Sequence, residues 1–198
     1  MRITVINHLT LDGVMQAPGR ADEDTRDGFD HGGWASAVID APDPAIGEAT
    51  AARMAQSDGL LLGRRTYEDL LASWNAQGGP FKDALNNAPK YIASTTLAEP
   101  LPWPNSTLLG DDVDADVRAL KARPGRELHI MGSGQLIHTL MQHRLVDEFL
   151  LLIHPIVLGR GRRLFPDDGT YTSLELVDAQ PTTSGVIIAT YRTASQPT

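Results

Sequence analysis

Cysteine is absent from the 198-residue sequence. Its absence excludes disulfide bonds, thiolate nucleophiles and zinc–thiolate sites together, and it fits a reducing compartment. Long apolar runs are missing as well: the longest, Phe149–Ile153, is far too short to cross a bilayer. The N-terminus begins in alternating, strand-like sequence and lacks the basic segment and long apolar core of a signal peptide. We therefore expect a cytoplasmic protein with no membrane segment.

The sequence has fewer basic than acidic residues. The chain has 17 Lys and Arg against 25 Asp and Glu, a formal net charge of -8. Broad contact with nucleic acid or an anionic membrane needs a basic face, so we expect neither as a partner. The histidines show no ligand spacing such as His-Glu-x-x-His, which predicts no catalytic metal. A length of 198 residues suits one sizeable core, so we expect a single domain over residues 1–198.

Strand and helix patterns alternate along most of the chain. Short apolar or alternating runs predict strands, and apolar residues at helical spacing predict helices. Two alternating runs near the end predict an antiparallel hairpin. The whole pattern predicts an α/β domain with a mixed, mostly parallel sheet flanked by helices. The expected strands are residues 2–8, 60–62, 90–94, 107–109, 127–132, 146–159, 173–180 and 185–193, and the expected helices are residues 43–57, 112–123 and 134–143, with another opening after Gly63.

Residues 13–44 do not follow this alternation. The segment is rich in Gly, Asp and Pro, with Phe29, His31 and Trp34 scattered through it. Long irregular segments inside compact domains are usually functional, so we interpret this one as a lid or binding loop. The alternative is a poorly ordered surface excursion.

Two strand-to-helix junctions carry glycine. Arg64 and Arg65 follow Gly63 directly, and Gly132–Gly134 precede the next helix-like run. Such junctions offer backbone N–H groups and a positive helix end to a phosphate, and arginine adds charge-assisted hydrogen bonds. The second junction does not match the dinucleotide fingerprint, because Ile137 stands where the third glycine would be. The alternatives are an ordinary tight turn for the glycines and surface ion pairs with nearby acids for the arginines.

Four motifs in order resemble the dihydrofolate reductase superfamily. They read LTLDGVM, LLGRRTYE, YIASTTL and IMGSGQLIHTLM. With a fifth, HPIVLGRGRRLF, they resemble more closely the reductase domain of bifunctional riboflavin-biosynthesis proteins and its stand-alone bacterial relatives. The resemblance covers Arg2 to about Phe165 and implies a dihydrofolate reductase-like fold that binds NADPH.

The resemblance also implies where NADPH lies. The Gly-Arg-x-Thr element would meet the 2′-phosphate and pyrophosphate, the following Ser-Thr the adenosine end, the paired glycines the pyrophosphate, and the Leu-Asp-Gly loop the nicotinamide. The implied cofactor residues are Leu11, Gly13, Met15, Gly63, Arg64, Arg65, Thr66, Ser94, Thr95, Gly132, Ser133, Gly134, Gln135 and Leu136.

The catalytic and substrate candidates follow from their position relative to the implied cofactor site and, for His154, from the resemblance, which places its run near the substrate. Asp12 is the carboxylate nearest the expected nicotinamide and is our candidate catalytic residue, although Asp-Gly also makes ordinary turns. His31, Trp34 and His154 are candidate substrate residues, with a core aromatic as the alternative for Trp34. The arginines of residues 160–163 either bind a substrate phosphate or form a solvated loop.

We therefore expect an NADPH-dependent reductase that transfers hydride to a C=N or C=O bond of a small pterin-like or ribosylaminopyrimidine-like substrate. The carboxylate pattern of dihydrofolate reductases is not evident, so a nucleotide-binding sensor or interaction module without turnover is the alternative. The apolar run of residues 146–158 and the terminal hairpin offer more surface than one sheet face buries. Together with the common pairing of the stand-alone relatives, this predicts a homodimer.

Overall fold

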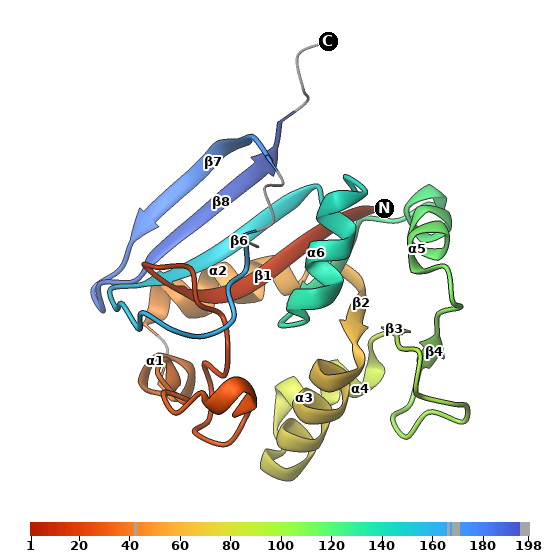
Figure 1. Ribbon diagram of the computed structural model, residues 1–198, viewed down its shortest axis with the longest axis horizontal. Coiled ribbons are helices and arrows are strands. Elements are labelled where there is room, and N and C mark those ends of the chain that lie inside the picture. Colours follow the sequence, from red (N-terminus) through yellow and green to blue (C-terminus); the bar gives the residue numbers. More distant parts are fainter. Residues whose placement is uncertain (42, 166, 168–170, 195–198) are drawn as a thin grey trace.

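A computed structural model describes residues 1–41, 43–165, 167 and 171–194. Within these residues eight strands form one sheet in the order β4-β3-β2-β5-β1-β6-β8-β7 (Figure 1). The strands are β1 (Arg2–Thr10), β2 (Ser57–Gly63), β3 (Lys90–Ala93), β4 (Ser106–Leu108), β5 (Glu127–Met131), β6 (Glu148–His154), β7 (Leu174–Pro181) and β8 (Ile187–Thr193). The helices are η1 (Arg26–Gly28), α1 (Ser36–Asp40), α2 (Pro44–Met54), α3 (Arg64–Gln77), α4 (Pro80–Asn87), α5 (Val113–Ala122) and α6 (Gly134–Gln142).

The sheet is mixed, as predicted. Strands β4, β3, β2, β5, β1 and β6 run parallel, whereas β8 pairs antiparallel with β6 and β7 antiparallel with β8. The carboxyl ends of the six parallel strands therefore meet at one edge of the sheet. This arrangement confirms the predicted α/β fold with a C-terminal antiparallel hairpin.

Helices cover both faces of the sheet because successive strand residues point to opposite sides. On one face, α5 and α6 pack on a core that includes Val5 and Ile130. On the other, Ile46 of α2 packs against β1 and β6, and Leu71 of α3 against β2 and β3. The central strands are thus buried on both sides, which explains their nearly continuous apolar sequences.

One strand ends well before its predicted boundary, and two short helices were not predicted. Strand β6 ends at His154 rather than at residue 159, because Pro155 has no N–H for a ladder and the N–H groups of Leu158 and Gly159 donate to Asp12 instead. Helices α1 and α4 were not predicted. Both are short, with 5 and 8 residues, and so carry too few turns for a clear apolar period.

The irregular segment is packed and is no surface excursion. Apart from Pro42, which lies outside the described residues, it contains two short helices, η1 and α1, joined by irregular chain. Val14 and Phe29 are buried in a small core of their own, and a Cβ added to Gly161 would lie 2.6 Å from Val14 and 2.8 Å from Phe29. The loop after β6 thus comes close enough to the segment to require glycine at this position.

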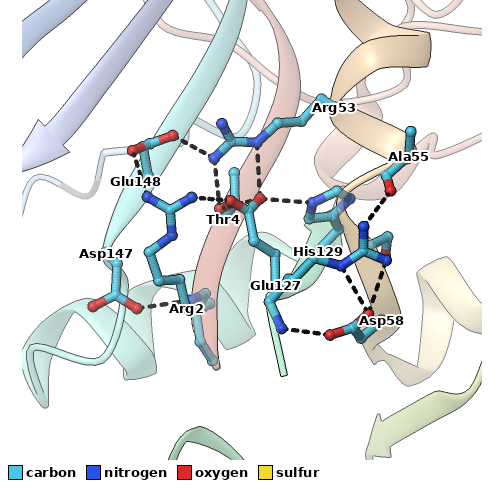
Figure 2. A network of polar contacts seen from close by, with 12 residues as sticks. Arg2, Thr4, Arg53, Ala55, Asp58, Glu127, His129, Asp147 and Glu148 are labelled. Carbon is cyan, nitrogen blue, oxygen red and sulfur yellow. Dashed lines mark hydrogen bonds and ion pairs between the residues drawn. The ribbon is translucent and has the colours of Figure 1, made fainter. Parts of the chain in front are cut away.

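A network of paired charges occupies the amino-terminal edge of the sheet (Figure 2). The carboxylates of Glu127 and Glu148 are buried, and the guanidinium of Arg53 from α2 lies between them, 2.9 Å from Glu127 through Nε. His129 Nε2 lies 3.0 Å from Glu127 Oε2, and the Thr4 hydroxyl donates to the same oxygen. Burial by itself would raise the pKa of Glu127, but His129 and the charges of Arg53 and Arg2 lower it below its usual value.

Candidate functional site

A cleft of about 2000 Å³ opens at the carboxyl edge of the parallel strands. Small-molecule pockets usually measure roughly 300 to 1,000 Å³, so the cleft has room for two ligands side by side. Its walls include residues 63–66 after β2, residues 93–96 after β3 and residues 131–136 after β5. Three of the sequence motifs, far apart in the chain, therefore meet here because β3, β2 and β5 are neighbours in the sheet.

The starts of α3 and α6 are joined to each other. The Gly63 N–H donates to Ser133 Oγ at 3.0 Å, and the Ser133 N–H donates to Thr66 Oγ1 at 2.9 Å. Neither helix has a side-chain hydrogen bond from its N-cap, Gly63 for α3 and Ser133 for α6. Two positive helix ends without a side-chain cap thus lie together at the cleft, which favours an anionic group between them.

The glycine turn is closely packed. Gly132 has a φ of 55°, and a Cβ there would lie 2.9 Å from Thr66 Oγ1. Ser133 also has a φ of 55°, a conformation that costs a non-glycine residue roughly 1 to 3 kcal/mol. A Cβ on Gly134 would lie 3.2 Å from Met15 Sδ. Met15 therefore lies against the start of α6, as expected if the first loop and the glycine turn contact one ligand.

Arg64 and Arg65 differ in their surroundings. Arg64 Nε is 3.1 Å from Glu68 Oε2, and its Nη1 donates to Thr96 Oγ1 at 2.7 Å. Arg65 has no hydrogen bond or ion pair within the part of the chain that the structure describes, and Asp69 is held by Arg20 at 2.5 Å. The surface-pair alternative thus holds for Arg64, whereas Arg65 is an exposed cation that lines the cleft.

The turn after β3 is shaped by Ser94. Its hydroxyl oxygen accepts hydrogen bonds from the N–H groups of Thr96 at 3.1 Å and Leu97 at 3.0 Å. Thr95 is exposed, and Ser94, Thr95 and Thr96 all line the cleft. Thr96 was not predicted as a site residue, although its link to Arg64 joins this turn to the start of α3.

Asp12 lies outside the lining of the cleft. Its carboxylate accepts hydrogen bonds from the Thr10 hydroxyl at 2.6 Å and from the N–H groups of Leu158 at 3.2 Å and Gly159 at 2.8 Å. These bonds, that of Thr10 above all, lower the pKa of Asp12. This geometry supports the turn alternative, in which Asp12 positions the loop after β6, and its catalytic role stays a prediction.

Of the other predicted residues in the loop after β1, some line the cleft and some do not. Leu11 is exposed and Gly13, with a φ of 80°, forms the turn, and neither lines the cleft. Only Met15 of the three predicted loop residues does so. The loop turns away because the Leu164 N–H donates to the Gly13 carbonyl and the Met15 N–H to that of Arg162.

Two of the three predicted substrate residues contact each other through their rings. Trp34 and His154 have ring centroids 5.2 Å apart in an edge-on arrangement. His154 Nε2 lies 2.8 Å from Nδ1 of His8, which was not predicted. His8 itself lines the cleft, whereas His154, Trp34 and the exposed His31 do not. The sequence offered one indication of His8: it lies near the carboxyl end of β1, two residues after Ile6 and therefore on the same face of the strand.

Burial keeps this histidine pair uncharged. Desolvation, and then the neighbouring His154, lower the pKa of His8 to about 3, and desolvation lowers that of His154. At neutral pH the two rings are therefore joined as a donor and an acceptor, with the tautomers set by this bond.

The arginines after β6 hold the irregular segment. Arg160 donates to the Gly28 carbonyl, Arg162 to Asp27 at 2.7 Å, and Arg163 to the Asp12 carbonyl at 2.9 Å. Their side chains remain 38 to 49% exposed, as expected for a solvated loop, but each is paired, so none can bind a substrate phosphate without breaking a contact. Ion pairs between two irregular segments could not be read from the sequence.

Two further properties concern metals and membranes. Within residues 1–41, 43–165, 167 and 171–194, no three Asp, Glu or His side chains come together to form a possible metal site. In the same residues, none of the helices combines the length and apolar character needed to span a bilayer.

Comparison with known proteins reveals one family. The family model of the RibD C-terminal domain matches residues 2–188. The uncharacterized protein YyaP of Bacillus subtilis (strain 168) is 33% identical over 143 residues, which cover 69% of this chain and 74% of YyaP. The uncharacterized protein YwjB of the same organism is 27% identical over 119 residues, 60% of this chain and 64% of YwjB.

Solved structures share the fold. A putative riboflavin biosynthesis protein from Shewanella sp. PV-4 matches with a TM-score of 0.73 at 23% identity, covering 98% of this chain and 100% of the other. The diaminohydroxyphosphoribosylaminopyrimidine deaminase/5-amino-6-(5-phosphoribosylamino)uracil reductase from Thermotoga maritima matches with a TM-score of 0.62 at 14% identity, covering 98% of this chain and 56% of the other.

Proposed function

Because the chain belongs to the RibD C-terminal domain family, we propose that it is an NADPH-dependent reductase of a small heterocyclic substrate with a C=N or C=O bond. The observation that carries the proposal is the junction at the cleft where the starts of α3 and α6, without side-chain caps, meet beside Arg65, which has no partner in the described residues. Each feature alone is common, but together they form a site for a ligand with two separate phosphate groups.

The residues present fit the pyrophosphate of a dinucleotide. The first-turn N–H groups of α3 and α6 face the cleft without a side-chain acceptor from their caps, and both helices are long enough for a useful dipole. Gly132 and Gly134 keep the backbone free of side chains where Thr66 and Met15 already approach closely. Ser133 and Thr66 hold the two helix starts in register.

Arg65 fits the extra phosphate that separates NADPH from NADH. Its guanidinium is exposed, lines the cleft and needs no partner broken before it binds an anion. Arg64 is partly neutralised by Glu68 and contacts Thr96, so we assign it to positioning the adenosine end. Guanidinium groups bind phosphate oxygens in bidentate fashion, which suits them to this task.

When bound, NADPH would supply a hydride from its nicotinamide ring to the carbon of the C=N or C=O bond, and the nitrogen or oxygen takes up one proton. The chain's own residues bind the cofactor, orient it across the carboxyl edge and shield the cleft from water. Met15 borders the glycine turn, and residues 16–20 of the irregular segment also line the cleft.

The experiment is a pair of measurements on the purified protein. Calorimetric titration with NADPH and NADH tests the site, and loss of NADPH absorbance across a panel of pterins and ribosylaminopyrimidines tests turnover. We expect preferred NADPH binding and substrate-dependent, stoichiometric oxidation. Tight NADPH binding with no oxidation by any substrate would instead favour a nucleotide-binding sensor, an alternative supported by the position of Asp12 away from the cleft.

We also propose that the protein is a homodimer formed through its antiparallel edge. Strand β7 is exposed along nearly its whole length, and Leu176 and Val177 are 59% and 47% exposed. A long, apolar edge strand invites pairing with another chain. Sedimentation should give twice the mass of one chain at micromolar concentration, and Val177→Lys should shift it toward the monomer. A monomer mass that does not change with concentration contradicts the dimer.

A further inference from the structure

Part of the cleft has apolar walls outside α3 and α6. These walls come from β1 and β6 of the sheet and from α1 and α2 (Figure 1). We call this part the apolar chamber and define it by the residues that both line the cleft and belong to, or pack on, one apolar cluster: Ile6, Val38, Ile46, Met54 and Leu152.

The polar groups that β1 and α2 bring to the chamber are neutral. His8 lies two residues after Ile6 on the same face of β1 and lines the cleft. One of its ring nitrogens is engaged by His154, and burial holds its pKa at about 3, so it carries no charge at neutral pH. Thr50 of α2 adds a hydroxyl. Neutral groups of this kind can hydrogen-bond a ring carbonyl or N–H, but they offer no charge to an anion.

Apart from Arg65, the arginines that line the cleft are already paired within the described residues. Arg20 is bound to Asp69 at 2.5 Å, Arg26 to Asp24 at 2.7 Å, and Arg162 to Asp27 at 2.7 Å. Arg163 Nη2 lies 3.8 Å from Asp12, and its Nε donates to the backbone carbonyl of that residue. A phosphate here would therefore have to displace a carboxylate from an arginine.

Acidic groups make an anion still less favourable. Glu23, Asp24 and Asp40 also line the cleft. The Glu23 carboxylate accepts hydrogen bonds from the N–H groups of Gly19 and Arg20 and forms no ion pair in the described residues. Desolvation, which outweighs these two bonds, raises the pKa of Glu23. By contrast, Arg65 at the start of α3 has no acidic partner in the described residues.

We infer that the apolar chamber takes an uncharged, flat ring system without a phosphate group, in contrast to the phosphoribosyl compound named for the Thermotoga reductase. This inference rests on the proposed function for the nature of the reaction and concerns only the substrate. The apolar walls bury the faces of the ring, and the neutral His8 offers its polar edge a hydrogen bond. Charge in the cleft is thus divided: the anionic cofactor belongs at α3 and α6, and the neutral ring belongs between β1, β6 and α2.

The test uses a matched pair of probes, 2-naphthol and 2-naphthyl phosphate, titrated by calorimetry into protein saturated with NADP⁺. At saturation, NADP⁺ occupies the phosphate site at α3 and α6, so any difference in affinity between the two probes comes from the chamber. We expect 2-naphthol to bind at least about tenfold more tightly than its phosphate ester, which corresponds to about 1.4 kcal/mol. Equal affinities, tighter binding of the phosphate, or binding of neither probe at millimolar concentration would overturn the inference.

Two variants of α2 locate the effect. Thr50→Arg places an unpaired cation at the chamber, whereas Ala52→Arg adds the same charge at an exposed position of the same helix that does not line the cleft. We expect Thr50→Arg to tighten 2-naphthyl phosphate binding at least about tenfold, and Ala52→Arg to change it less than twofold. Equal changes in both variants would contradict binding in the chamber.

The outcome is separable from that of the proposed function. If NADP⁺ does not bind at all, the proposed cofactor is wrong, and the same probes are then compared on Arg65→Ala, which removes the unpaired cation of the other part. A preference for 2-naphthol in that protein would still support the neutral chamber. Tight NADP⁺ binding without a preference for 2-naphthol would reject the chamber and leave the cofactor site intact.

Discussion

The two edges of the parallel sheet handle charge in opposite ways. At the amino edge, Glu127 and Glu148 are buried and both pair with Arg53 (Figure 2). At the carboxyl edge, α3 and α6 begin without side-chain caps, Ser133 is strained and Arg65 has no partner in the described residues. Both edges belong to the same strands, so strand geometry cannot explain the difference. A paired charge stabilises the fold, whereas an unpaired cation and uncapped helix ends remain available for a ligand.

The largest expected effect breaks the amino edge. Arg53→Met leaves Glu127 and Glu148 buried without the guanidinium between them and should lower the free energy of unfolding by about 3 to 5 kcal/mol. Urea denaturation measures it. The control, Arg192→Met, removes an exposed partner 3.6 Å from Glu148 and should cost about 1 kcal/mol or less. If the two variants lost the same free energy of unfolding, the buried pairing of Arg53 would contribute no more to stability than the exposed pairing of Arg192.

A second test titrates both edges together. Glu127 has a lowered pKa, so the stability it contributes is complete above its unfolded pKa and is lost as the pH falls through the folded value. His129 and His8 also have lowered pKa values, and below about pH 6.5 the unfolded chain gains protons that the folded chain refuses. The free energy of unfolding should therefore fall steadily from about pH 6.5 downward.

His8→Phe separates the two edges in this titration. Between about pH 6.5 and pH 4, the variant should lose less unfolding free energy than the wild type does. The difference is at most about 3.4 kcal/mol over those 2.5 pH units, and it is smaller where water reaches the ring. Urea denaturation at a series of pH values measures both slopes. An unfolding free energy that stays flat over this range in the wild type contradicts the buried, neutral histidines.

The third prediction concerns the unpaired cation. Arg65→Ala should weaken NADPH binding roughly ten- to a hundredfold, because it removes a charge-assisted hydrogen bond of about 1.5 to 3 kcal/mol, and should hardly change NADH binding. Arg64→Ala is the matched control and should have the smaller effect, since Glu68 already pairs with Arg64. Calorimetry with both cofactors on each variant measures the difference. Equal losses for NADPH and NADH would show that Arg65 does not contact the 2′-phosphate.

The smallest expected effect concerns Asp12. Its hydrogen bonds to Leu158 and Gly159 predict that Asp12→Asn lowers the free energy of unfolding by about 1 to 2 kcal/mol while turnover changes little. Exposed Asp30→Asn serves as the control. A fall in turnover of about a hundredfold at unchanged stability and NADPH affinity would restore Asp12 as the catalytic residue.

Local patterns predicted most of the fold. Alternating and continuous apolar runs located all eight strands of the described residues to within a few positions, because a strand's burial repeats every two residues or is continuous. The exception in length, β6, ended early at Pro155, whose effect depends on where the following N–H groups find acceptors. Helix α4 was not predicted, because its 8 residues give little apolar periodicity.

The site was only partly predictable. Gly63–Thr66 and Gly132–Leu136 line the cleft, as do Met15, Ser94 and Thr95, because junctions after parallel strands necessarily meet at one edge. His8 was not among the predicted residues, and Asp12, chosen because its loop was expected to border the nicotinamide, lies outside the lining of the cleft. Loops carry no period, so the direction of each side chain depends on contacts with distant segments.

The sequence by itself determined the order of the strands and of the longer helices, the absence of thiol chemistry and the glycine junctions, since these follow from local pattern and composition. Only the tertiary structure decided which charges remain unpaired. Arg64 and Arg65 are neighbours in the sequence, yet one pairs with Glu68 and the other has no partner in the described residues. Arg20, from the irregular segment, holds Asp69. An ion pair depends on distances between side chains brought together by folding, and those distances cannot be read from spacing along the chain.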